Sequence, residues 1–408
     1  MRHTKYVLIY FLILCFAGCA SAKKEESNVI LVWHWMSDRD EAFQELAKKY
    51  EEETGTKVRF EIFAPSEVYA QRVKASAQTA TLPDIYGVLG EKRDFASFIK
   101  SGYIASLSPA LDEVVEGVAW KDKLFKKAVS VNEFPAGNEF GVEPGIYGVP
   151  LDVMTIQMVY NKKLYKQAGL DPEVPPRTWE EFMGHASILR EAGIPRLAGG
   201  FGEIWMLDAL ASNLAMSVMG EGKVFDTYRG KVLYTDPDWV RVLSLFKQMT
   251  DEKVFVEGAV TMVNKTAEQT FANERAAYAF NGSWCVNVYR GMNPDLQYAA
   301  MLPPSVSNLH PARIWGGAGS SFVVNAASPR RGEAIKFLKL LTDEKQQSFL
   351  AEATENLPSN KASVGKISPV LASFGDDMDN TTHPNVYTVH ELPPVVEAFD
   401  KGIQSILI

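Results

Sequence analysis

The sequence predicts an α/β protein with more than one domain, and three observations support this. Its 408 residues exceed the size of one ordinary domain. Short apolar runs of strand length alternate with longer amphipathic segments of helix length along the whole chain. The first such segments, within residues 29–63, combine into a β-α-β unit, from which parallel sheets are built.

The β-α-β unit begins with a strand at residues 29–33, an uninterrupted apolar run. The following helix is expected to start at Ser37 or Asp38, residue types that cap helices, and to end at Gly55. Its apolar side chains recur at helical spacing: Phe43, Leu46, Ala47 and Tyr50. Residues 57–63 alternate between apolar and polar and are expected to form the second strand.

The later elements continue this alternation. Thr178 and Glu181 form a capping box that starts one helix. Other helices are expected at 68–80, 240–249, 266–273, 328–341 and 342–349, and strands at 83–86, 147–160 and 320–325. Residues 132–148, rich in Gly, Pro and Asn, are expected to be a surface loop. The apolar pattern of the last helix reaches Ile408, so we expect that helix to continue past this residue.

The composition is that of a soluble, acidic globular protein. Hydrophobic residues make up 46% of the chain and charged residues 23%, and the formal net charge is −8. No block rich in Lys and Arg occurs, and phosphate backbones require one. Nucleic acid is therefore not an expected partner.

The N-terminus has the pattern of a processing signal. Arg2 and Lys5 precede an apolar run too short to span a bilayer, which ends in Phe16-Ala17-Gly18-Cys19, similar to a bacterial lipobox. We expect residues 1–18 to be a lipoprotein signal peptide, Cys19 to carry the lipid, and residues 19–28 to be a flexible tether. The protein would then be extracytoplasmic and lipid-anchored to the bacterial membrane. Plain secretion, with cleavage after Ala20 or Ala22, is the alternative.

Signatures of catalysis and of metal binding are weak. None of the six His forms an HExxH motif, and neither a GxSxG elbow nor a Walker loop occurs. The acids Asp376, Asp377 and Asp379 favour a solvated turn over a calcium site. Cys285 lacks a neighbouring His and is expected to be a buried small apolar residue. We therefore expect no enzyme activity, no cofactor and no metal.

Tryptophans cluster near the ends of predicted strands and in loops. They are Trp33, Trp35, Trp205, Trp284 and Trp315. A flat indole covers the C–H face of a sugar, while carboxylates and amides bond its hydroxyls. This mixture is typical of a carbohydrate cleft. Trp33 lies inside the first strand and is expected in the core, whereas Trp35 follows that strand, where ligands approach α/β sheets.

Several short stretches resemble a known family when read in order. They are Leu-Pro-Asp-Ile at 82–85, residues 101–104, 147–150, 159–162, 178–182 and 276–278, Asn-Gly-Ser-Trp at 281–284, and residues 316–317, 322–325, 333–338 and 357–360. From residue 29 to about residue 408 the chain is similar to extracellular solute-binding proteins of family 1. These are the sugar receptors of ABC importers and include maltose-binding protein.

The resemblance implies a two-lobed periplasmic-binding-protein fold of type II, with a mainly parallel sheet in each lobe. Residues 29–151 and 296–327 would form the first lobe, and residues 152–295 and 328–408 the second. A monomer would bind a mono- or oligosaccharide between the lobes, close by hinge bending, and deliver it to the permease subunits of an ABC transporter.

The resemblance also implies roles for individual residues. Trp284 would stack on the sugar from the second lobe, and Asp152 would lie where the chain crosses, as a ligand contact or a hinge hydrogen bond. Further candidates, taken from family contact positions, are Trp35, Ser37, Asp38, Gly90, Glu91, Lys92, Glu203, Trp205, Trp315, Gly316 and Gly317. Glu91 and Lys92 could equally belong to a solvated loop.

Other functions remain open on the sequence alone. The same fold could bind a polyol phosphate, a polyamine or a metal, which would require basic, acidic or Tyr and His linings respectively. A secreted carbohydrate-active enzyme needs two facing carboxylates, and no motif marks such a pair. A chemoreceptor partner or an adhesin without transport is a further possibility.

Overall fold

The computed structural model describes residues 29–408 except residues 65, 91, 376–377 and 383–392. Several predictions fall outside the described residues: the signal peptide at 1–18, the tether at 19–28, the lipidation site Cys19, the candidate Glu91, and Asp376 and Asp377 of the acidic turn.

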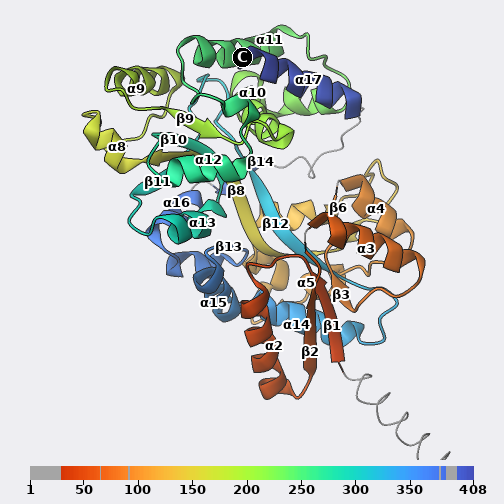
Figure 1. The fold of residues 1–408 in the computed structure, drawn as a ribbon. Coiled ribbons are helices and arrows are strands. Elements are labelled where there is room, and N and C mark those ends of the chain that lie inside the picture. Colours follow the sequence, from red (N-terminus) through yellow and green to blue (C-terminus); the bar gives the residue numbers. More distant parts are fainter. Residues whose placement is uncertain (1–28, 65, 91, 376–377, 383–392) are drawn as a thin grey trace, which may run out of the picture.

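Figure 1 shows two lobes joined by two long strands that run from one lobe into the other. These strands are β8 (Val149–Asn161) and β12 (Ile314–Val324), and we refer to them as the crossing strands. They pair antiparallel with each other over most of their length. The lobes are therefore connected through a continuous sheet, and the two-lobed α/β architecture expected from the sequence is confirmed.

The first lobe, in the lower half of Figure 1, contains most of the elements before β8 and two helices from much later in the chain. Its elements are β1 (Val29–His34), α2 (Asp40–Thr54), β2 (Lys57–Ile62), α3 (Ser66–Gln78), β3 (Ile85–Tyr86), α4 (Lys92–Lys100), α5 (Ser108–Leu111), β4 (Val114–Val115), β5 (Val118–Ala119), α6 (Trp120–Lys123), α7 (Lys126–Val131), β6 (Glu133–Phe134), β7 (Gly145–Ile146), α14 (Arg331–Leu341) and α15 (Glu344–Thr354).

The second lobe follows β8. Its elements are α8 (Lys162–Gln167), α9 (Trp179–Glu191), β9 (Leu197–Gly199), α10 (Ile204–Tyr228), α11 (Pro237–Asp251), η1 (Ala259–Thr261), α12 (Asn264–Ala272), β10 (Tyr278–Gly282), α13 (Cys285–Met292), β11 (Tyr298–Met301) and α17 (Pro393–Ile406). Between α15 and α17 lie β13 (Leu357–Pro358), η2 (Lys361–Lys366), α16 (Pro369–Gly375), η3 (Met378–Asn380) and β14 (Thr381–Thr382).

The main sheet has the strand order β2-β1-β3-β12-β8-β10-β9, with β11 and β13 also paired to β8 and β14 to β12. Within the first lobe β1 pairs parallel with β2 and β3, and within the second β10 pairs parallel with β9. The carboxyl ends of these parallel strands face the region of the crossing strands. Ligands bind α/β sheets at such edges.

Each lobe has its own apolar core. The first core includes Phe43, Phe60, Phe322 and Phe337. The second includes Phe182, Trp239, Phe246 and Tyr278, and a third cluster with Phe271, Tyr289 and Phe374 packs on Val153 and Val159 of β8. Separate cores joined by two strands allow one lobe to move relative to the other with few core contacts broken.

Residues 331–354 pack in the first lobe, which differs from the expected assignment of residues 328–408 to the second. Phe337 and Leu338 of α14 and Leu350 of α15 belong to the first core. The return to the first lobe also comes later than expected. Strand β11 pairs with Met158–Asn161, at the second-lobe end of β8, so the chain crosses in β12 and not near Leu296. An apolar stripe predicts a helix but does not say which core it joins.

Most of the predicted elements are present, and three local details differ. Helix α2 has Arg39 at its N-cap without a side-chain cap bond, so neither Ser37 nor Asp38 caps it. Helix α15 begins after Asp343, while Thr342 accepts a 2.9 Å hydrogen bond from the Trp120 indole. The expected surface loop at 132–148 contains β6 and β7 and buries Phe134.

Candidate ligand-binding cleft

A cavity of ≈ 150 Å³ lies against the crossing strands on the side of the first lobe. Three of the predicted site residues line it: Trp35, Gly90 and Lys92. The other lining residues come from the loop after β3, from α4 and the end of α7, and from both crossing strands: Val88, Leu89, Phe95, Val131, Asn132, Met154, Ala318, Gly319, Ser320, Ser321 and Val323. The cavity therefore lies at the carboxyl ends of β1 and β3, as expected for an α/β ligand site.

Trp35 is positioned by the backbone that follows β3. A Cβ built on Gly87 would lie 2.4 Å from the Trp35 ring, so only glycine leaves room for the indole. The Trp35 ring also lies 5.0 Å from the ring of Tyr69, centroid to centroid. The Tyr69 hydroxyl accepts a hydrogen bond from Gly87 N (2.7 Å) and lies 3.2 Å from Trp33 O. Tyr69 thus joins the ends of two neighbouring strands beneath Trp35.

Lys92 lines the cavity, but its ammonium group is engaged by the protein. Nζ donates to Val131 O at 2.5 Å and to Glu133 O at 2.8 Å, and lies 4.2 Å from the centre of the Phe134 ring. Burial lowers the pKa of Lys92 to about 7, against the opposing influence of the Glu133 charge. These contacts tie α4 to the segment between α7 and β6.

Two tryptophans of the second lobe form the feature that we call the tryptophan corner, which comprises Glu203, Trp205, Asn264, Glu268 and Trp284. The Trp205 and Trp284 rings lie 6.1 Å apart, centroid to centroid, at 52°. Trp205 is 42% exposed and Trp284 is half-buried. An exposed indole set at an angle to a second one offers two apolar faces to a ligand.

Carboxylates orient both indoles of the tryptophan corner. Trp205 Nε1 donates to Glu203 Oε2 (2.9 Å), and Trp284 Nε1 donates to Glu268 Oε1 (3.3 Å). Asn264 joins the two halves, since its backbone N donates to Glu203 Oε1 (2.7 Å) and its side chain to Glu268 Oε1 (3.0 Å). Burial raises the pKa of Glu268, although these donors oppose the shift.

Glycines allow the tryptophan corner to form. A Cβ on Gly200 would lie 2.6 Å from Asn264 Cα, and a Cβ on Gly202 would lie 2.8 Å from the Thr261 carbonyl carbon. The loop after β9 can therefore approach the start of α12 closely. A Cβ on Gly282, the last residue of β10, would lie 2.0 Å from the Trp284 ring. Since Gly282 pairs with Ile156 of β8, the corner adjoins a crossing strand.

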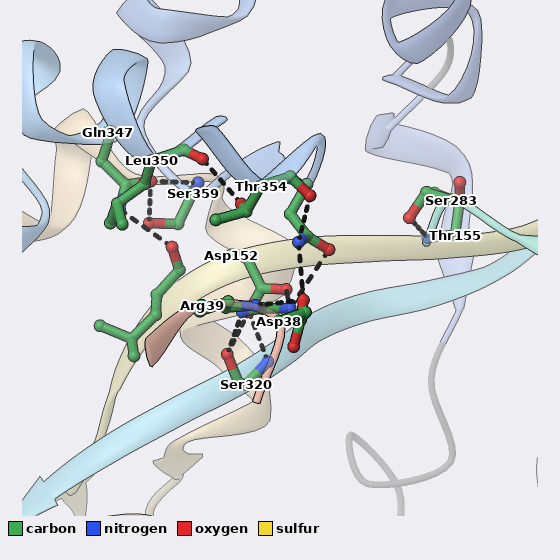
Figure 2. Close-up of polar contacts among 12 residues, drawn as sticks. Asp38, Arg39, Asp152, Thr155, Ser283, Ser320, Gln347, Leu350, Thr354 and Ser359 are labelled. Atoms are coloured by element: carbon green, nitrogen blue, oxygen red, sulfur yellow. Dashed lines mark hydrogen bonds and ion pairs between the residues drawn. The ribbon is translucent and has the colours of Figure 1, made fainter. Parts of the chain in front are cut away.

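A buried polar cluster, which we call the hinge network, joins the first lobe to both crossing strands (Figure 2). It comprises Arg39, Asp152, Ser320 and Asn356. Arg39 donates to Asp152 Oδ2 (2.9 Å), to Ser320 Oγ (3.0 Å) and to Asn356 Oδ1 (3.2 Å). Asp152 Oδ1 accepts Ser320 N (2.7 Å) and the Ser320 hydroxyl. Burial opposes the charge on Arg39, but Asp152 and Asp38 outweigh it and raise the Arg39 pKa.

The carboxylate of Asp152 is engaged by protein donors from two sides, Arg39 and Ser320. Its side chain is 7% exposed, and both of its oxygens accept protein donors. A Cβ on Gly319 would lie 2.6 Å from Asp152 Oδ2, so glycine makes space for the carboxylate between the strands. Both carboxylate oxygens of Asp152 therefore have protein partners.

The other predicted residues occupy different places around the crossing strands. Asp38 lies beside the hinge network, where its carboxylate accepts Asn356 Nδ2 at 3.4 Å, and Ser37 is exposed. Trp315 pairs with Ile156 and packs against the second core. Gly316 and Gly317 are buried in β12, and a Cβ on Gly316 would lie 2.5 Å from Met154 O, so this glycine serves strand pairing.

Sequence reasoning missed Arg39, Asn264, Glu268 and Asn356. Glu268 could have been found, because it lies one turn before Phe271 on the buried side of the predicted helix. A charged residue at an apolar position often has a specific partner. Arg39 carried no such signal, since its partner Asp152 is 113 residues away.

Two observations concern metal ligands and the thiol in the described part of the chain. Among the described residues, no three His, Cys, Asp or Glu side chains converge as metal ligands. Cys285 is fully buried, as predicted, and burial raises the pKa of its thiol well above the ordinary value. Within the described ranges, no helix is long and apolar enough to cross a bilayer.

Comparison with known proteins agrees with this architecture. Residues 35–348 match the family model of bacterial extracellular solute-binding proteins. The chain is 22% identical over 349 residues to a multiple sugar-binding protein of Streptococcus mutans, covering 81% of this chain and 75% of that one. It is 24% identical over 358 residues to the diacetylchitobiose binding protein DasA of Streptomyces coelicolor, covering 84% and 76%.

A solved chitin oligosaccharide binding protein has the same fold. The TM-score is 0.70 at 20% sequence identity, with 92% of this chain and 98% of that chain covered. The family match spans most of the sequence, and the structural likeness includes both lobes and the crossing strands. This chain therefore belongs to the bacterial extracellular solute-binding protein family.

Proposed function

We propose that this protein is the carbohydrate receptor of an ABC importer. A single observation carries the proposal: the tryptophan corner lies at the carboxyl edge of β9 and β10 beside the crossing strand β8, with its indoles held by carboxylates. Oriented indoles suit the C–H faces of sugar rings, and amides and carboxylates suit their hydroxyls. The named relatives, a multiple sugar-binding protein and a diacetylchitobiose binding protein, support the same ligand class.

The ligand would lie between the lobes, with Trp35 on one side and Trp205 and Trp284 on the other. Closure of the lobes about β8 and β12 would bury it, and the closed form would be recognised by the permease subunits. The ligand shifts the balance toward the closed form because it contacts both lobes only there.

Charge at the cavity supports a neutral ligand over an anion. Of the described residues that line it, Lys92 is the one cation, and two carbonyls already bind its ammonium. A phosphate ligand would need uncommitted Arg or Lys side chains. This favours a sugar over a polyol phosphate.

The proposal includes binding without chemical turnover, as a monomer at the outer side of the membrane. The lipobox-like sequence ending in Cys19 supports attachment by a lipid. Fractionation of cells that express the full-length protein tests this part. We expect the wild type in the membrane fraction and Cys19→Ala in the soluble extracytoplasmic fraction. Equal membrane association of both would contradict lipidation at Cys19.

A thermal-shift screen tests the binding function. The panel contains neutral oligosaccharides of glucose, xylose, galactose and N-acetylglucosamine, together with sugar phosphates and polyamines. A ligand at a hundred times its Kd adds about 2.7 kcal/mol, which raises Tm by about 2 °C or more in a chain of this size. We expect a rise with one class of neutral sugar. A rise with phosphates or polyamines alone would contradict the carbohydrate assignment.

A further inference from the structure

Asp208 is an unusual carboxylate within the second lobe. It lies on α10, three residues after Trp205, and its side chain is half-buried. No described residue donates a hydrogen bond to Asp208 or forms an ion pair with it, and loss of solvent is the one influence on its ionisation. A half-buried carboxylate without a protein donor depends on the water that still reaches it, so donors from a bound molecule can take the place of that water.

The neighbouring carboxylates, unlike Asp208, accept hydrogen bonds from the protein. Glu203 accepts from Trp205 Nε1 and Asn264 N, and Glu268 accepts from Asn264, Asn281 and Trp284. These two residues orient the indoles and have donors from the protein itself. The missing donors of Asp208 are therefore a local feature and not a general property of the acids in this region.

The position of Asp208 indicates where its missing partner comes from. Residues three apart on a helix lie on the same face, so Asp208 is next to Trp205, whose indole is 42% exposed. Helix α10 starts just beyond the carboxyl end of β9 and packs beside β12, the crossing strand that carries Trp315. A molecule on the exposed face of Trp205 would therefore be within reach of the first two turns of α10.

The chemistry of such a molecule follows from the two side chains. It must present an apolar face to the indole and hydrogen-bond donors at its edge to the carboxylate. A pyranose ring has C–H groups on one face and hydroxyl donors around its rim. Two neighbouring hydroxyls can donate to the two oxygens of one carboxylate.

We propose that Asp208 is a ligand-binding residue, whose carboxylate accepts hydrogen bonds from the hydroxyls of the sugar ring that stacks on Trp205. This assignment rests on the proposed function, because the donors are supplied by a carbohydrate in the cleft. Asp208 would distinguish sugars by the position of their hydroxyls, since only a ring with donors at this edge replaces the lost hydration.

Titration calorimetry of the full chain lacking only the signal peptide tests the assignment, using the neutral sugar that raises Tm most. Asp208→Asn keeps the size of the side chain but removes the charge and one acceptor. Hydrogen bonds to a charged group contribute enough to predict a rise in Kd of about 10- to 100-fold. Asp226→Asn is the matched control, because Asp226 is an acid of α10 beyond the kink at Gly220 and already has Lys231 as partner. We expect its Kd to be unchanged.

The pH dependence of binding separates ligand contact from a structural role. Burial raises the pKa of Asp208 in the free protein to about 6. Hydroxyl donors bind the ionised carboxylate, so the affinity of the wild type should fall as the pH is lowered from 7.5 to 5. Glu203 and Glu268 are retained in Asp208→Asn, so any pH dependence that they cause persists in the variant. The part due to Asp208 should be missing from it.

The unliganded proteins provide a check on folding. The folded-state pKa of Asp208 is raised above that of the unfolded chain, so this group contributes most to stability at low pH and the contribution is lost as the pH rises through about 6. Asp208→Asn should therefore melt at the same or a higher temperature than the wild type at pH 7.5. A melting temperature lowered by several degrees would assign Asp208 a structural role and overturn the proposal.

The remaining outcomes distinguish this proposal from the proposed function. If the wild type binds a neutral sugar and Asp208→Asn binds it with the same Kd and the same pH dependence, only the role of Asp208 is contradicted. If the wild type binds no sugar in the panel, the proposed function is contradicted and the assignment of Asp208 with it.

Discussion

Arg39 Nη2 lies 2.9 Å from Asp152 Oδ2, which connects the start of α2 to the crossing strand β8. The two residues are 113 positions apart, and Ser320 of β12 completes the contact from the other crossing strand. Asn356 joins from the segment that follows α15. The hinge network thus ties the first lobe to both crossing strands through side-chain contacts.

Removal of Arg39 should destabilise the protein strongly. Arg39→Ala leaves the buried carboxylate of Asp152 with Ser320 alone, and breaking a buried pair from one side costs about 3 kcal/mol or more. Urea unfolding at neutral pH measures the loss. Lys247→Ala, which breaks the exposed pair with Asp251 on α11, should cost about 0.5 kcal/mol or less. Equal losses for both variants would contradict the role of the hinge network.

Trp205 should contribute to binding far more than to folding. Its side chain is 42% exposed, so Trp205→Ala should lower the free energy of unfolding of the unliganded protein by about 1 kcal/mol or less. Loss of the stacking surface should raise the Kd for the sugar at least about tenfold. Leu309→Ala, at an apolar residue that is 85% exposed, should change neither quantity. Unchanged sugar affinity in Trp205→Ala would show that the tryptophan corner is not part of the binding site.

Gly282→Ala tests the placement of Trp284 without removing its indole. The added Cβ would lie 2.0 Å from the ring, so the ring must move. We expect sugar affinity to fall by about tenfold or more, since the indole is no longer held at its angle to Trp205. The control is Gly291→Ala on α13, where a Cβ meets nothing within 4 Å. Calorimetry that finds Gly282→Ala equal to this control would show that the angle between the indoles is unimportant.

Lys92 should make stability depend on alkaline pH. Its folded-state pKa is lowered to about 7 from an ordinary 10.5, so between pH 7 and 10 the unfolded chain carries a proton that the folded protein lacks. The free energy of unfolding therefore rises with pH in this window, by at most about 1.4 kcal/mol per pH unit. This contribution of Lys92 is lost again as the pH falls through 7. Urea unfolding at pH 7, 8 and 9 should show this rise in the wild type and not in Lys92→Met.

The control for Lys92 lies on the same helix. Lys100 is exposed at the end of α4, so Lys100→Met should keep the pH dependence of the wild type. A Lys92→Met protein with the same slope as Lys100→Met would show that Lys92 stays protonated in the folded protein at neutral and mildly alkaline pH.

Local patterns predicted the secondary structure well, because each depends on neighbouring residues only. The β-α-β unit appears as β1, α2 and β2, and the capping box of Thr178 and Glu181 is present with both of its hydrogen bonds. The burial of Trp33 and Cys285 followed from their apolar neighbours and is confirmed. Trp35 was expected beyond the first strand and lines the cavity there.

Long-range packing could not be predicted in the same way. The apolar stripe of α14 fits either core, and only the folded chain places Phe337 beside Phe60 of β2. The length of the segment at 132–148 could be read from the sequence. The hydrogen bond from Lys92 to the start of this segment could not. For the same reason the partner of Asp152 could not be predicted. A carboxylate on a crossing strand could bind a ligand or an arginine from a distant helix, and the sequence does not show which distant residues lie near it.

Calorimetric titration of the wild type and of Trp284→Ala with a neutral oligosaccharide tests the central claim most directly. The account predicts saturable binding of one sugar per wild-type chain and no measurable binding by Trp284→Ala, while Glu268 keeps its hydrogen bonds from Asn264 and Asn281 and the unliganded variant stays folded. Equal binding by the two proteins, or no binding of any neutral sugar by the wild type, would contradict it.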